Sequence, residues 1–104
     1  MARMVVIYKT PQNPAAFDKH YFEIHIPLAK KLPGLRKYEV SHGAIDSPAG
    51  ASGVYLIGML HFDDLAAIGR AFASPEGQAC RRDREVFAPT DADYQMYLFD
   101  NREV

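Results

Sequence analysis

The spacing of hydrophobic and polar residues along the chain predicts four strands and three helices. Short runs rich in β-branched and aromatic residues predict strands at residues 4–9, 35–42, 54–62 and 94–99. Capping residues, prolines and apolar side chains at helical spacing predict helices within residues 13–31, after Asp63 or Asp64, and at residues 74–88.

The two helices predicted between residues 63 and 88 form one connection between strands, so the predicted order of elements is β-α-β-β-α-β. This order is typical of the ferredoxin-like split β-α-β arrangement, an α+β fold in which helices lie on one face of a four-stranded antiparallel sheet. The length of 104 residues predicts a single domain, residues 1–104. Strands 4–9 and 54–62 are apolar on both faces, although helices can cover only one face. We therefore predict a homodimer in which the uncovered sheet faces pack together.

The first predicted helix carries the most informative pattern. Asn13 can cap it, and Pro14 suits the first helical position. Pro27 lacks the N–H that a continuing helix needs, so we expect the helix to end or kink near Ile26, with a further turn beyond it. The apolar stripe expected along this helix consists of Phe17, Tyr21, Ile24 and Leu28.

Two histidines flank this stripe. Five residues of α-helix separate His20 from His25 by about 140° of rotation. We therefore place them on opposite flanks, where they cannot readily chelate one metal ion. The chain also contains no phosphate-binding glycine loop, no Cys-x-x-Cys pair and no serine nucleophile elbow. Nucleotide and zinc chemistry are disfavoured, and we expect neither a metal nor another cofactor.

Composition limits the partners and the compartment. The formal net charge of -1 gives no general attraction to nucleic acid or to acidic membranes. No apolar run approaches the ~20 residues that span a bilayer. The single thiol, Cys80, cannot form an internal disulfide, which fits a reducing cytoplasm. Residues 43–53, rich in Gly, Ala, Ser and Pro, predict a mobile surface loop. We expect a soluble cytoplasmic protein without nucleic-acid or membrane partners.

Three motifs in this order resemble signatures of the EthD family: the run from His25 to Leu28, then Leu32-Pro33-Gly34, and the block from Ser74 to Asp83. The resemblance covers nearly the whole chain and implies a dimeric α+β barrel. Members of that family occur in gene neighbourhoods for the breakdown of ethers and other organic compounds, often beside oxygenases. Related barrels include cofactor-free monooxygenases, lactone isomerases and polyketide cyclases. Some distant relatives bind haem through a histidine.

The candidate catalytic residues are His25, His61 and Asp83. His25 precedes the proline break and could move a proton near neutral pH, or its ring could bond a carbonyl that the break frees. His61 lies on an apolar strand and either lines a pocket or makes a local hydrogen bond. Asp83 is a charge on the otherwise apolar side of the last helix. It needs a partner, which could be His25 or a nearby arginine.

Four further residues are candidates for ligand contact: His20, Tyr21, Tyr55 and Met59. His20 could instead lie at a solvent or dimer edge. The arginines at positions 81, 82 and 84 are expected on the outer, solvated face of the last helix, and Cys80 is expected to pack in the core.

These residues favour binding or conversion of a small apolar organic molecule by acid–base chemistry on a histidine. Isomerisation, dehydration and oxygen addition would all use such a base, and no cofactor would take part. The alternative is a non-catalytic protein that binds such a compound and serves a partner oxygenase. The sequence does not decide whether the protein is an enzyme.

Overall fold

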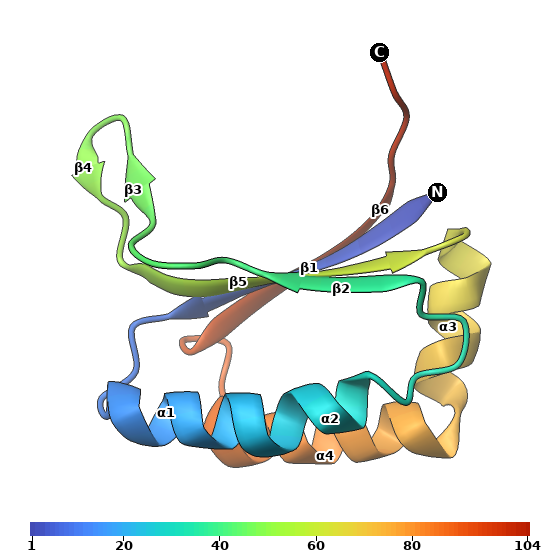
Figure 1. Cartoon of the computed structure of the whole chain (residues 1–104), viewed down its shortest axis with the longest axis horizontal. Helices are drawn as coiled ribbons and strands as arrows, with labels where there is room; N and C mark the ends of the chain where they lie inside the picture. The colour runs from blue at the N-terminus through green and yellow to red at the C-terminus, as the bar shows by residue number, and fades with distance from the viewer.

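A four-stranded antiparallel sheet forms one layer of the protein, and the computed structural model describes all residues, 1–104 (Figure 1). The strand order is β2-β5-β1-β6, with antiparallel pairing throughout. This order and the two helical crossovers confirm the predicted ferredoxin-like α+β fold. The strands are β1 (Ala2–Lys9), β2 (Lys37–Val40), β5 (Val54–Phe62) and β6 (Tyr94–Asp100).

The helices all lie on one side of this sheet. Figure 1 shows one long helical rod beside α4 beneath the sheet, while α3 stands at one end between the two layers. The rod consists of α1 (Pro14–His20), a π-helical segment η1 (Tyr21–His25) and α2 (Ile26–Ala29); the second crossover consists of α3 (Leu65–Ala73) and α4 (Pro75–Phe87). None of these helices is long and apolar enough to cross a membrane.

Side-chain caps fix where the helices begin. The Asn13 carboxamide oxygen accepts a hydrogen bond from the Ala16 N–H at 3.1 Å. Asp64, rather than Asp63, accepts from the Ala67 N–H at 2.7 Å and begins α3. Ser74 accepts from Gly77 N–H at 3.1 Å, and the proline after it occupies the first turn of α4. Each cap satisfies a backbone N–H that the first helical turn leaves free.

The expected end of the helix near Ile26 is wrong: the regular α-helix gives way to the π-helical segment η1, and the rod then continues. Ile26 keeps helical dihedral angles (φ −58°, ψ −46°), and its N–H bonds to the Tyr21 carbonyl five residues earlier. In a regular α-helix the Pro27 ring would press against the carbonyl four residues before it, and a wider π-turn relieves that clash. The chain therefore continues into α2 without a break.

The π-turn changes which residues face the core. The predicted stripe holds for Phe17 and Tyr21, which are buried, but Ile24 is 47% exposed. His25 takes the buried position instead. Buried residues now recur at every fourth position because the wider turn shifts the rod's inner face: Phe17, Tyr21, His25 and Ala29.

The core lies between this inner face and one side of the sheet. The buried hydrophobic residues of the sheet are Ala2, Met4, Val6, Tyr8, Leu56, Leu60 and Phe62. The other side of the sheet carries no helix (Figure 1) and remains partly exposed, as expected. On that side the edge strand presents Tyr97 and Phe99, which are 52% and 42% exposed.

Residues 43–53, expected to form a mobile surface loop, contain a short hairpin that the sequence analysis missed. Its strands are β3 (Asp46–Ser47) and β4 (Gly50–Ala51). The Ser47 hydroxyl donates to the Gly50 carbonyl at 3.0 Å, and Gly50 adopts a positive φ that a glycine tolerates without strain. The hairpin projects from the start of β5, away from the helix layer (Figure 1).

Candidate functional site

An apolar cavity of about 420 Å³ lies between the sheet and the helix layer. Of the 18 residues that line it, 14 are hydrophobic, so the space suits an apolar molecule. Met96 and Leu98 of the edge strand β6 belong to its wall and are 40% and 52% exposed, which leaves this side open. Its volume falls within the usual range of about 300–1,000 Å³ for small-molecule sites.

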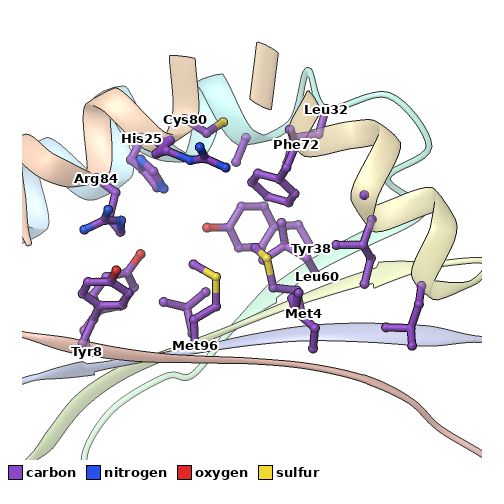
Figure 2. Close-up of a pocket in the computed structure, with 18 residues that line it drawn as sticks. Met4, Tyr8, His25, Leu32, Tyr38, Leu60, Phe72, Cys80, Arg84 and Met96 are labelled. Atoms are coloured by element: carbon purple, nitrogen blue, oxygen red, sulfur yellow. The ribbon is translucent and has the colours of Figure 1, made fainter. Parts of the chain in front are cut away.

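Polar groups gather at one end of the cavity. Figure 2 shows His25 and Arg84 pointing down from the helices and Tyr8 rising from the sheet at the same end. The opposite end is made of hydrophobic side chains, including Phe72 and Leu60. The cavity is therefore polar at one end and apolar at the other.

His25 is held at the polar end by Asp83. Its Nδ1 lies 2.9 Å from Asp83 Oδ2, while His20 Nε2 lies 2.8 Å from Asp83 Oδ1. Of the two partners that the sequence left open for Asp83, the structure shows His25 rather than an arginine. The expected placement of the two histidines on opposite flanks is wrong, because the π-turn brings His25 to the side of the rod that faces α4.

The surroundings of His25 keep its ring neutral. Burial lowers its pKa from the ordinary value of 6.5, and the charges of His20 and Arg84 lower it further, against the hydrogen bond and charge of Asp83. An ionised carboxylate can only accept, so the neutral ring donates Nδ1–H to Asp83. The Nε2 lone pair stays free. An imidazole in this state at the wall of an apolar cavity has the free lone pair that general-base chemistry requires.

Tyr21 and Tyr38 form a hydroxyl pair across the core, with 2.5 Å between their oxygens. Burial raises the pKa of Tyr38 to about 12 and also raises that of Tyr21, so both stay protonated. Only Tyr38 lines the cavity. Tyr21, a candidate for ligand contact, packs behind it in the core, stacked on the His25 ring at 5.5 Å between centroids.

His61 and Met59 lie on the other face of the sheet. Alternation along β5 directs Leu60 toward the cavity and its two neighbours away from it. His61 Nε2 lies 2.8 Å from Glu39 Oε1 on that open face. Of the two alternatives for His61, the structure shows the local hydrogen bond, so the prediction of His61 as a second catalytic histidine in the cavity of His25 is wrong. Met59 cannot touch a ligand in that cavity.

Tyr55 and His20 are also outside the cavity wall. The pairing of β1 and β5 shifts register where Lys9 pairs with Val54, and Tyr55 lies at this irregularity. Its ring packs against Phe17 of α1, and its hydroxyl donates to the Asp18 carboxylate at 2.8 Å. His20 reaches the site only through Asp83.

Five polar residues that line the cavity were not predicted to do so: Tyr8, Tyr38, Arg81, Arg84 and Tyr94. The alternation of β1 could have placed Tyr8 on the same side as Met4 and Val6. The prediction of a solvated Arg84 is wrong, since this side chain is half-buried. It lies one helical turn after the buried Cys80, and this spacing is the signal that could have identified it.

Cys80 packs in the core, as expected. Burial, together with the charge of Asp83, raises the pKa of its thiol to about 11. The thiol therefore stays protonated near neutral pH and is a poor nucleophile.

The fold and the site define a small ferredoxin-like α+β protein with a histidine–aspartate pair beside an apolar cavity. The family model described as the EthD domain matches residues 9–91. The chain therefore belongs to the EthD family.

Two similar proteins agree with this family assignment. An uncharacterized 11.0 kDa protein from the thcB-thcC intergenic region of Rhodococcus erythropolis is 39% identical over 89 residues, 85% of this chain and 84% of that protein. The crystal structure of an EthD family protein from Bacillus halodurans is 32% identical and covers 98% of this chain and 99% of that one, with a TM-score of 0.89.

More distant structures share the fold alone. The cofactor-independent oxygenase SnoaB from Streptomyces nogalater has a TM-score of 0.70 and 16% identity, over 99% of this chain and 94% of that one. A dimeric ferredoxin-like protein from Jannaschia has a TM-score of 0.68 and 18% identity, over 97% of this chain and 100% of that one.

Proposed function

We propose that this protein binds a small apolar organic molecule in its cavity and that His25 moves a proton on it without a cofactor, in the cytoplasm. The observation that carries this proposal is the position of His25. Its side chain is 9% exposed and lines a cavity that is otherwise mainly apolar, while Asp83 holds Nδ1. A neutral base that is largely shielded from bulk water can accept a proton from a bound molecule, and the proton is then not lost by exchange with solvent.

Isomerisation, dehydration and oxygen addition are the reactions that this arrangement supports best. Each can begin with removal of a proton by a base, which is the one chemical step that the His25–Asp83 pair provides. The fold shared with a cofactor-independent oxygenase supports the idea that such a cavity can work without a bound cofactor. At 16% identity, that likeness shows the fold alone.

We also propose that the protein works as a homodimer joined through the open sheet face. This face presents apolar side chains from three strands: Val5, Ile7, Ile57, Met59, Tyr97 and Phe99. An exposed apolar surface of this kind is stabilised by contact with a second copy. The dimeric ferredoxin-like protein from Jannaschia supports this assembly.

A non-catalytic carrier is the alternative function. It is favoured by the apolar majority of the cavity wall and by the open side at Met96 and Leu98, through which a compound could enter and leave. A carrier would bind its compound without converting it. Its affinity would not change between pH 6 and pH 7, where an ordinary histidine titrates.

The test uses the variants His25→Gln and His42→Gln. Wild-type protein is incubated with a panel of small phenols, enols and lactones, and products are followed by mass spectrometry. For any compound converted, His25→Gln should lower kcat by about 100-fold or more, because general-base catalysis contributes roughly 10²–10⁴. His42, outside the cavity, is the control and should leave kcat unchanged.

Each other outcome has a clear meaning. Full activity of His25→Gln would contradict the catalytic role of His25. Binding of panel compounds without conversion of any of them would support the carrier instead.

A further inference from the structure

We propose that the ligand carries one acidic oxygen on an apolar body, and that Arg84 and Tyr8 bind this oxygen. The oxygen belongs to a phenol, an enol or a carboxylic acid, all of which become oxyanions on losing a proton. The inference rests on the proposed function, because it names the class of compound that would occupy the same cavity.

Arg84 supplies a positive charge that the protein does not neutralise. The guanidinium forms none of the ion pairs in the chain, although it is half-buried at the cavity wall. Nη1 donates to the Ala88 carbonyl at 2.8 Å, and the group stacks over the Tyr94 ring at 4.3 Å from its centroid. These contacts hold the guanidinium in place but contribute no negative charge. Its remaining N–H donors and its positive charge are therefore available to an anion.

Tyr8 supplies a hydrogen-bond donor that has no partner in the protein. The side chain is 2% exposed, and its hydroxyl makes no hydrogen bond to another protein group. Every fully buried polar side-chain atom has a partner, so this hydroxyl must reach the cavity that Tyr8 lines. Burial raises the pKa of Tyr8, which keeps the proton on the oxygen. An oxygen atom of a ligand would satisfy this donor.

The remaining charges at this end leave room for an anion. Asp83 is the nearby carboxylate, and its two oxygens are already bound to His20 and His25. The other guanidinium on the wall, that of Arg81, is exposed and adds positive charge. The hydrophobic end, with Phe72 and Leu60, lies across the cavity (Figure 2) and would hold the apolar body.

This placement gives His25 a defined proton to remove. The O–H bond of a bound phenol or enol breaks, the proton adds to Nε2, and the electron pair stays on the oxygen. The resulting oxyanion is stabilised by Arg84 and by the Tyr8 O–H. Nothing is oxidised or reduced in this step, so it needs no further reactant.

The test compares three probes that share one naphthalene ring and differ in the group at position 2: 2-methylnaphthalene, 2-naphthol and 2-naphthoate. Calorimetric titration at pH 7.5 should show that the wild-type protein binds 2-naphthol or 2-naphthoate at least about tenfold tighter than 2-methylnaphthalene, as charged hydrogen bonds imply. Whichever of the two oxygen probes binds tighter separates phenolic from carboxylic ligands.

Arg84→Met should remove this preference and leave the affinity for 2-methylnaphthalene within about twofold, since Met retains most of the apolar stem. Arg82→Met, an exposed position on the same helix, is the matched control and should behave as wild type. Tyr8→Phe is a second variant that keeps the packing and should weaken the preferred oxygen probe by about fivefold through one lost hydrogen bond.

Equal affinity for the three probes, or a preference that survives both Arg84→Met and Tyr8→Phe, would overturn this inference and leave the proposed function standing. Failure of all three probes to bind would overturn the proposed function together with the inference. Thermal unfolding of each variant shows whether a lost preference comes from a lost fold.

Discussion

Replacing Gly77 with alanine should lower the free energy of unfolding by about 3 kcal/mol or more, through overpacking between two helices. A methyl group at this position would lie 2.3 Å from the Ala71 carbonyl oxygen and 2.4 Å from the Phe72 Cα. Both are backbone atoms of α3, so no side chain can move aside and the two helices must separate. Chemical denaturation followed by circular dichroism measures the change.

The matched control for this prediction is Gly69→Ala in the middle of α3. A methyl group there meets no atom within 4 Å, so alanine should stabilise the protein by about 0.5–1 kcal/mol through the lower backbone entropy of its unfolded state. Equal effects of the two substitutions would contradict the close approach of α3 and α4. That approach positions Phe72 and Cys80 at the cavity wall.

Replacing Asp83 with alanine should lower the free energy of unfolding by about 2–4 kcal/mol, because two imidazole groups lose a charged acceptor. The Asp83 side chain is only 11% exposed, so water has little access to replace the two hydrogen bonds that the imidazole groups lose. Asparagine retains the volume and one acceptor oxygen, so Asp83→Asn should cost about half as much. The same denaturation experiment measures both variants.

Asp63→Ala is the control for the Asp83 variants. Asp63 also forms an ion pair, with Arg36 at 2.8 Å, but both side chains are more than half exposed. Removing a solvated pair of this kind should leave stability close to that of the wild type. If Asp83→Ala were as harmless as Asp63→Ala, the His20–Asp83–His25 cluster would not contribute to the fold as described.

The fold could be predicted from the sequence because its signals are local. Apolar runs marked the four strands of the sheet, and Asn13 and Ser74 marked the starts of helices that the structure confirms. The hairpin within residues 43–53 was missed because its two strands have only two residues each. Strands this short leave no alternation to detect.

The site could be predicted only in part, because it depends on how one helix is wound. The contact of His25 with Asp83 was among the alternatives that the sequence left open, and the structure confirms it. A rotation of 100° for each residue placed His20 on the far flank and Ile24 in the core, and both placements fail across the π-turn. No pattern of single residues specifies a π-turn, although Pro27 showed that the helix was disturbed there.

Arg84 shows a second limit of prediction from sequence. An arginine in a run of charged residues is usually solvated, and Arg81 and Arg82 are exposed. Arg84 lies half-buried because one side of α4 faces the cavity. Arg84 is on that side, one helical turn after the buried Cys80. The long apolar stem allows an arginine to occupy such a boundary position.

The most direct test of the central claim is a ¹⁵N NMR titration of the histidine rings. We expect His25 to be neutral at pH 7 with its proton on Nδ1, and to titrate below the ordinary pKa of 6.5 because burial disfavours the charged ring. An imidazolium at pH 7, or a neutral ring with its proton on Nε2, would contradict this expectation, since neither form leaves a base facing the cavity.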